Sequence, residues 1–168
     1  MDTLNGLLIK IADGDDSAFE RLYIKTRRGV YAFLYTYYRN SHDTEDAMQS
    51  VYLRIKRKIH LYNAGGNARS CILEIAKNYA LSDLMRQKRI ELTDDESTFN
   101  SHAHSQSSEF IITDLMERYL SSEERKIIVL HVIWGYKHRE IAELLGLPMG
   151  TVRSKYKRAV DKLKEAVK

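Results

Sequence analysis

Apolar side chains recur along most of the chain at the spacing of three and four residues that is typical of amphipathic helices. From Asp16, this pattern predicts one helix, or two helices separated by a break near Gly29. A further helix is expected from Ser41, where the residues offer helix caps, with acids in the first turn and bases in the last. Gly65 and Gly66 then interrupt the pattern and predict a loop. Because strand signals are nearly absent, we predict an all-α fold.

The chain then divides around a polar stretch. Residues 71–89 predict another helix. Its apolar stripe comprises Ile72, Ile75, Ala76, Tyr79, Ala80 and Leu84. Residues 91–110 are acidic, carry few apolar side chains and predict a flexible linker. Beyond it two helices are expected, the second opening at Ser121 with a sequence that resembles a capping box. We therefore predict two small helical domains, residues 1–90 and 111–168, joined by this linker.

The last thirty residues predict a helix-turn-helix that begins at His138. The small side chain of Ala142 would let the two helices cross closely, and Gly146 supplies a turn conformation that other residues adopt only with strain. Pro148 suits the first turn of the second helix, because its missing N–H costs nothing there. The buried face of that second helix is expected to comprise Val152, Tyr156, Ala159, Val160 and Leu163.

Basic and hydroxyl side chains fill the remaining faces of this motif. A second helix of this kind enters the major groove of DNA with its N-terminal residues near the base edges. Arginine can donate two hydrogen bonds to a guanine, whereas lysine mainly contacts phosphate, so Arg153 is the main candidate for reading bases. The candidate DNA-binding residues are His138, Arg139, Thr151, Arg153, Ser154, Lys155, Lys157 and Arg158. An ordinary amphipathic helical hairpin is the alternative, but it does not account for the coincidence of glycine, proline and basic face.

Charge is unevenly distributed along the chain. The net charge of +4 combines a basic block in residues 54–89, with nine basic and two acidic side chains, and a second basic excess in residues 113–168. Residues 90–112 carry five acidic side chains and no basic one. Two basic blocks favour two nucleic-acid contact surfaces, although solvated helix faces give the same pattern.

Several classes of function find no support in the sequence. Cys71 is the only cysteine, so neither a disulfide framework nor a cysteine metal site is expected. His102 and His104 lie in the polar stretch without partners at ligand spacing. No apolar run approaches the roughly 20 residues that cross a bilayer, and no nucleophile–base pair or phosphate loop is evident. We therefore expect a cytoplasmic protein that inserts in no membrane, is not an enzyme and uses no metal or cofactor.

Residues 19–57 resemble the first conserved domain of the bacterial sigma-70 family of RNA polymerase initiation factors, and above all its small two-domain extracytoplasmic-function type. The resemblance rests on an acidic pair, a glutamine and an aromatic-leucine pair. These residues are Glu45, Asp46, Gln49, Tyr52 and Leu53. In the family this helix docks on the largest subunit of the polymerase, so the resemblance implies that these five residues bind core RNA polymerase. Ser50 departs from the family pattern, which usually has an acid there.

Two further segments resemble the promoter-reading parts of the family. Residues 71–89 contain the pattern I-A-x-N, which ends here at Asn78. In the family this pattern belongs to the helix that, together with the loop before it, reads the −10 element. The C-terminal motif looks like the part of the family that reads the −35 element. The implied −10 residues are Tyr62, Asn63, Lys77, Asn78, Ser82, Arg86 and Arg89. Tyr62 is either a platform for an unpaired base or a core aromatic, and Asn78 either contacts a base or makes a structural cap or interhelix bond. Cys71 stands where the family usually has tryptophan.

The resemblance implies a sigma factor that binds core RNA polymerase and directs promoter-specific transcription initiation at −35 and −10 elements. Its implied partners are core RNA polymerase, promoter DNA and, as for many family members, an anti-sigma factor. One alternative is a stand-alone helix-turn-helix regulator that binds duplex DNA without the polymerase. Another is a sigma-like protein that binds polymerase without opening promoters, given Cys71 and Ser50.

Overall fold

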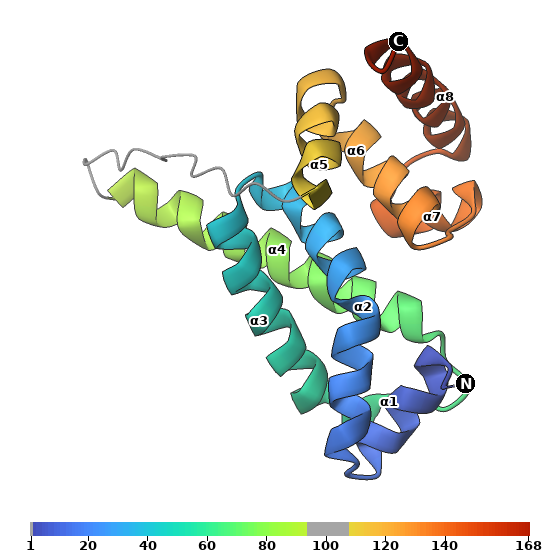
Figure 1. Ribbon diagram of the computed structural model, residues 1–168. Coiled ribbons are helices and arrows are strands. Elements are labelled where there is room, and N and C mark those ends of the chain that lie inside the picture. The colour runs from blue at the N-terminus through green and yellow to red at the C-terminus, as the bar shows by residue number, and fades with distance from the viewer. Residues whose placement is uncertain (1, 94–107) are drawn as a thin grey trace.

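The computed structural model describes residues 2–93 and 108–168, and every regular element within those ranges is a helix (Figure 1). The all-α prediction is confirmed. The elements are α1 (Leu4–Ala12), α2 (Asp16–Tyr38), α3 (Ser41–Lys58), the 3-10 turn η1 (Ile59–Leu61), α4 (Ala68–Thr93), α5 (Ser108–Tyr119), α6 (Ser122–Ile128), the π-helical turn η2 (Val129–Ile133), α7 (His138–Leu145) and α8 (Met149–Ala166). Most of the predicted linker, residues 94–107, lies outside the described residues.

In the N-terminal half, α2 and α3 lie side by side, with α4 crossing them and α1 packed at one end (Figure 1). The largest fully buried side chains here are Leu7, Leu8, Leu22, Phe33, Leu34, Ile55, Ile72 and Leu73. α4 presents its predicted stripe to this core, with Ala76 and Ala80 fully enclosed. α3 begins at Ser41 as predicted, although its cap is the preceding Asn40, whose side chain accepts a hydrogen bond from the Asp43 amide at 2.8 Å.

α2 is continuous, so the break considered near Gly29 does not exist. Glycine inside a helix costs up to about 1 kcal/mol relative to alanine, but here its missing side chain serves tertiary packing. A Cβ atom on Gly29 would lie 2.9 Å from Cε2 of Trp134. The indole Nε1 of Trp134 also donates a hydrogen bond to the Gly29 carbonyl at 3.0 Å. The glycine therefore makes room for a tryptophan from the other half of the chain.

In the C-terminal half, α6 begins with the predicted capping box. The Ser121 hydroxyl accepts a hydrogen bond from the Glu124 amide at 3.3 Å, and the Glu124 carboxylate accepts one from the Ser121 amide at 2.9 Å. Two orphan amides at the start of α6 are thereby satisfied. Lys162 of α8 adds a hydrogen bond to the same carboxylate at 2.9 Å, which ties α8 to α6.

The helix-turn-helix is formed by α7 and α8. Gly146 ends α7 with a φ of 66°, the left-handed conformation predicted for this turn. Pro148 lies at the N-cap of α8, just before the first turn where we had placed it, because its ψ of 141° is extended. Val152 and Ala159 are fully buried, which confirms the predicted inner face of α8.

The two halves pack directly against each other, with α6 and η2 lying on α2. Besides the contact between Trp134 and Gly29, two basic side chains of the N-terminal half donate hydrogen bonds to backbone carbonyls of the C-terminal half. Arg69 donates a hydrogen bond to the Trp134 carbonyl at 2.8 Å, and Lys77 donates one to the Leu144 carbonyl, also at 2.8 Å. The interface therefore combines one large apolar anchor with hydrogen bonds to backbone carbonyls.

Candidate polymerase and promoter interfaces

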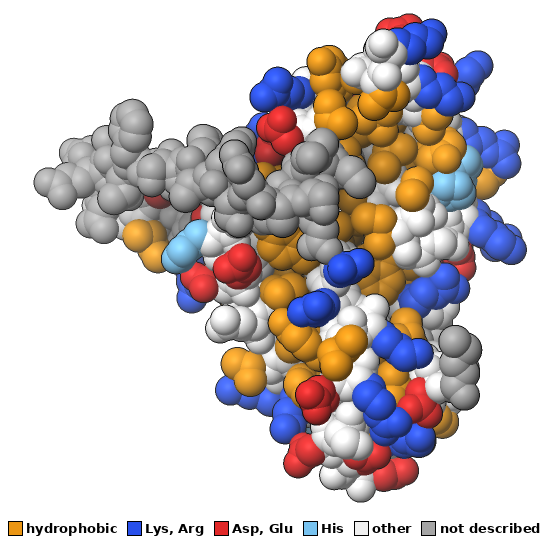
Figure 2. Space-filling model, viewed as in Figure 1, with side chains coloured by type: hydrophobic (Ala, Val, Ile, Leu, Met, Phe, Trp, Pro, Cys, Tyr) orange, Lys and Arg blue, Asp and Glu red, His pale blue; other side chains and the backbone are white. Residues whose placement is uncertain are grey.

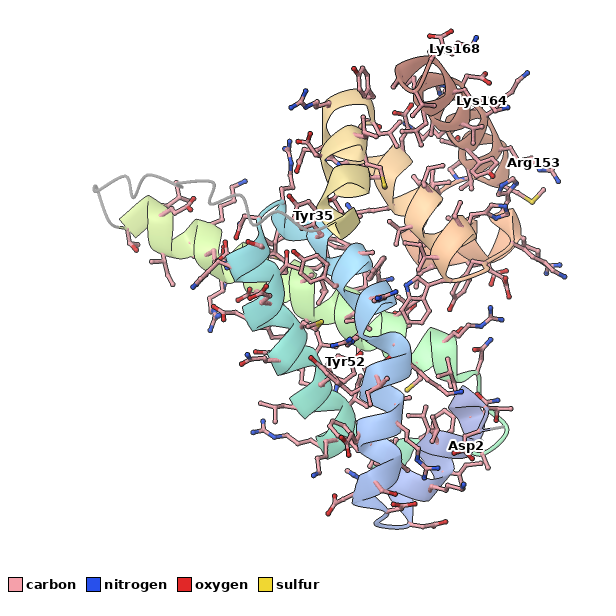
Figure 3. All side chains as sticks on the ribbon, in the orientation of Figure 1. Asp2, Tyr35, Tyr52, Arg153, Lys164 and Lys168 are labelled. Carbon is pink, nitrogen blue, oxygen red and sulfur yellow. The ribbon has the colours of Figure 1, made fainter. Side chains whose placement is uncertain are left out.

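The outer face of α8 carries four exposed residues that were predicted to bind the −35 element: Arg153, Ser154, Lys157 and Arg158. Since Val152 and Ala159 anchor the opposite face in the core, packing turns the basic side outward. Figure 3 shows the Arg153 side chain pointing away from the body of the protein, and Figure 2 shows Lys and Arg side chains along this edge of the C-terminal half. The basic face of α8 is therefore exposed to solvent, as is required of a helix that binds in the major groove.

Three other predicted −35 residues make contacts within the protein. Lys155 places its Nζ 2.8 Å from the Glu123 carboxylate of α6, and only 24% of its side chain is exposed. This ion pair competes with any DNA phosphate. Thr151 is half-buried, and its backbone carbonyl accepts a hydrogen bond from the Ser154 hydroxyl at 3.1 Å, so this contact engages the side chain of Ser154. Arg139 is exposed, and its Nε atom lies 3.5 Å from the Glu143 carboxylate. This weak surface contact leaves Arg139 able to meet a DNA phosphate.

His138 begins α7 but packs inward. Its ring centroid lies 4.8 Å from that of His131 and 4.9 Å from that of Tyr156. Its Nε2 atom is buried and has no hydrogen-bond partner among the described residues. Burial lowers the pKa of His138, and the neighbouring His131 and Arg153 lower it further. The structure thus places His138 between η2 and α8, where it supports the DNA-facing helix.

The loop before α4 is closed around Tyr62. The Tyr62 hydroxyl lies within hydrogen-bond distance of two acceptors, the Asn5 side-chain oxygen at 3.1 Å and the Gly66 carbonyl at 3.0 Å, which share its single proton. Its ring packs against the core, which favours the core-aromatic interpretation over base stacking. Cys71 is half-buried against the same core, and burial raises the pKa of its thiol. Asn63 is exposed in the loop, and its side-chain oxygen accepts a hydrogen bond from the Gly65 amide at 3.1 Å.

The predicted −10 residues on α4 fall into two groups. Four are exposed and recur at helical spacing, so they share one face: Asn78, Ser82, Arg86 and Arg89. Asn78 lies in the middle of the helix, which excludes a helix cap. Arg86 is partly committed, because its Nη2 lies 2.6 Å from the buried Asp83 carboxylate. Lys77 instead points to the Leu144 carbonyl and is 21% exposed, so it cannot contact DNA in this arrangement.

The predicted polymerase-binding residues lie on α3. Four are exposed: Glu45, Asp46, Gln49 and Leu53. Leu53 has 57% of its surface exposed, so its side chain is available to a partner. Tyr52 differs, because it is 4% exposed and lies between α2 and α3 (Figure 3). Its hydroxyl is 2.7 Å from the Thr26 hydroxyl, and burial raises the pKa of Tyr52 to about 12.

A cavity of about 400 Å³ opens beside these residues, between α2 and α3. Its lining includes Gln49 and Leu53 together with three residues that the sequence did not single out for this site: Phe19, Tyr23 and Met48. Phe19 and Tyr23 both belong to α2, and both are only partly buried. The apolar residues of α2 cover more of the helix surface than one core-facing stripe requires. This excess could have indicated a second apolar face from the sequence.

Two family models match the chain: Sigma-70 region 2 over residues 22–90 and Sigma-70 region 4 over residues 112–163. The matches fall on the two helical halves, in the order expected of such a protein. The chain belongs to the sigma-70 family of RNA polymerase sigma factors. As a sigma factor of the extracytoplasmic-function (ECF) type it directs promoter-specific transcription initiation, binds core RNA polymerase and promoter DNA, and is not an enzyme.

Curated relatives agree with this family over nearly their whole length. The RNA polymerase sigma factor CarQ of Myxococcus xanthus is 28% identical over 161 residues, which cover 93% of this chain and 92% of CarQ. The ECF sigma factor SigX of Bacillus subtilis is 23% identical, with 89% of this chain and 84% of SigX covered.

Solved structures share the fold. CnrH in complex with the cytosolic domain of CnrY has a TM-score of 0.66 at 21% identity, covering 99% of this chain and 97% of the other. RpoE of Bartonella quintana, in complex with the anti-sigma factor NepR, has a TM-score of 0.70 at 21% identity, covering 89% and 96%. Within the described residues of the present chain, no helix is long and apolar enough to cross a membrane.

Proposed function

We propose that the sigma sites of this chain lie on three separate surfaces. The outer face of α8 reads the −35 element, the exposed face of α4 with the loop before it reads the −10 element, and α3 docks on core polymerase. The observation that carries this proposal is the display of Arg153, Lys157 and Arg158 on a helix whose other face is fully buried. Burial of Val152 and Ala159 leaves these three basic side chains free to meet DNA.

The division of labour follows from the energetics of promoter opening. Unstacking a base costs a few kcal/mol, so one surface must grip duplex DNA while another captures an unpaired base. α8 is suited to duplex DNA, since it can enter the major groove. Asn63 and Asn78 are exposed amides that can hydrogen-bond to base edges, and the basic block around them supplies contacts to phosphate.

We further propose a cytoplasmic location and control by an anti-sigma factor. Core RNA polymerase, to which the family binds, is found in the bacterial cytoplasm. The similar RpoE structure contains the anti-sigma factor NepR, and a partner of that class would compete with polymerase for the same exposed surfaces.

Two substitutions test these assignments against each other. Promoters are first selected from a random DNA library with holoenzyme containing the native chain. Arg153→Ala should lose about 1–3 kcal/mol of −35 discrimination in run-off transcription, with core binding intact. Gln49→Ala should weaken co-elution with core polymerase and leave −35 discrimination unchanged. Lys164→Ala is the matched control, because Lys164 is an exposed basic residue at the far end of α8 (Figure 3). This substitution should change neither −35 discrimination nor core binding.

The outcomes separate the remaining hypotheses. A native chain that binds duplex DNA but never co-elutes with core polymerase would support the stand-alone regulator. Co-elution without transcription would support a sigma-like protein that cannot open promoters. If Arg153→Ala weakened core binding as much as −35 discrimination, the substitution would have damaged the fold and α8 would not be a separate −35 surface.

A further inference from the structure

The loop between η1 and α4 is held by a residue of another helix, Asn5 of α1. The Asn5 side-chain oxygen accepts hydrogen bonds from the Ala68 amide at 2.8 Å and from the Tyr62 hydroxyl at 3.1 Å. The Ala68 amide can only donate, so the atom facing it must be the oxygen of the Asn5 amide. One acceptor therefore connects both ends of the loop.

Both bonds act where the backbone lacks other restraints. Ala68 is the first residue of α4, where an amide has no partner within its own helix. At the other end, the Tyr62 hydroxyl also faces the Gly66 carbonyl at 3.0 Å, and Gly66 donates its amide to the Asn63 carbonyl at 2.7 Å. A Cβ atom on Gly66 would lie only 3.0 Å from that Asn63 carbonyl. The loop is thus a tight turn closed over the Tyr62 ring and tied to α1.

α1 is a firm support for this contact. Leu7 and Leu8 are fully buried and Ile11 nearly so, which fixes the helix on the core. The Thr3 hydroxyl caps the helix by accepting a hydrogen bond from the Gly6 amide at 3.0 Å. Asn5 lies two residues before Leu7 and three before Leu8, so its side chain is carried by a helix end that packing and capping both immobilise.

We propose that Asn5 is a positioning residue for −10 recognition, which holds the loop of residues 62–67 against α1 so that exposed groups such as Asn63 meet the unpaired strand in a fixed geometry. Asn5 precedes residue 22, where the region 2 match begins, so the family match does not cover it. Preorganisation matters here because a loop that must be ordered during binding loses part of its affinity. The inference rests on the −10 role proposed above for this loop.

The test compares three variants of the full chain. Asn5→Ala removes the acceptor, Asn5→Asp keeps an oxygen at the same reach, and Asp13→Ala alters an exposed residue at the end of the same helix. Amide hydrogen exchange at Ala68 should quicken about fivefold in Asn5→Ala and stay near the native rate in the other two. In holoenzyme, the ratio of transcription from native and altered −10 elements should fall by a similar factor in Asn5→Ala alone, with core affinity and −35 discrimination unchanged.

The two readouts keep the inference and its premise apart. If Asn5→Ala frees the Ala68 amide but leaves −10 discrimination intact, this inference is overturned while the proposed function stands. Unchanged exchange at Ala68 would overturn it as well, because Asn5 would not restrain the loop. If altering the −10 element has no effect on the native holoenzyme, the proposed −10 role itself fails, and the inference fails with it.

Discussion

At the scale of single residues, His138 links the protonation state of the protein to its stability. Its Nε2 atom is buried beside His131 and near Arg153, and burial together with these charges lowers its pKa from the ordinary 6.5. Below pH 6.5 the unfolded chain therefore binds more protons at this position than the folded chain does. The free energy of unfolding should fall as the pH drops from 6.5 toward the lowered pKa.

His138→Gln should remove this part of the pH dependence, as measured by urea unfolding between about pH 5 and pH 8. His60→Gln is the matched control, because His60 is exposed on η1. A His138→Gln chain that keeps the full native slope would show that protonation of His138 does not oppose folding.

Other single residues show how far sequence patterns reach. Sequence spacing correctly predicted that Arg153 is exposed and that Val152 is buried, because both follow from helical periodicity in α8. Periodicity could not show that Lys77 bonds to the Leu144 carbonyl or that Lys155 pairs with a carboxylate of α6. Those partners are distant in sequence, so no local pattern contains them.

At the scale of elements, the capping box is the feature of α6 that the sequence predicts best, and the structure adds a third participant. Glu124 is 3% exposed, and burial would raise the pKa of its carboxyl group. Hydrogen bonds from Ser121 and Lys162 outweigh burial and lower the pKa of Glu124 instead. The carboxylate thus both caps α6 and anchors α8.

Two substitutions at Glu124 should separate these contributions. Glu124→Ala removes both the cap of α6 and the ion pair with Lys162, and it should lower the free energy of unfolding by about 1–3 kcal/mol. Glu124→Gln retains an acceptor for the Ser121 amide but loses the ion pair with Lys162, so its cost should be smaller. Urea unfolding at neutral pH measures both. Equal losses in the two variants would mean that the cap contributes nothing measurable.

At the scale of the whole molecule, the contact between Trp134 and Gly29 holds the two halves of the chain together. It also decides which groups can meet DNA, since Lys77 becomes available only when its bond to the Leu144 carbonyl is broken. Trp134 is the only tryptophan of the chain, so its fluorescence reports on this interface directly.

Gly29→Ala should force the halves apart or shift Trp134, because the added Cβ atom would lie 2.9 Å from the indole. We expect a red shift of the tryptophan emission and a larger radius of gyration in small-angle scattering. Gly150→Ala is the matched control, because a Cβ atom there meets open space in α8. An unchanged emission spectrum in Gly29→Ala would exclude the close packing described here.

The sequence by itself determined most of the helices after α1, the capping box at Ser121, the turn at Gly146 and the exposed basic face of α8, because each depends on residues within a few positions of one another. Only the tertiary structure decided that α2 passes unbroken through Gly29, that Tyr52 is buried between α2 and α3, and that Asn5 holds the loop before α4. The physical reason is that burial and hydrogen-bond partners across the core are set by segments far apart in the chain, which local spacing does not encode.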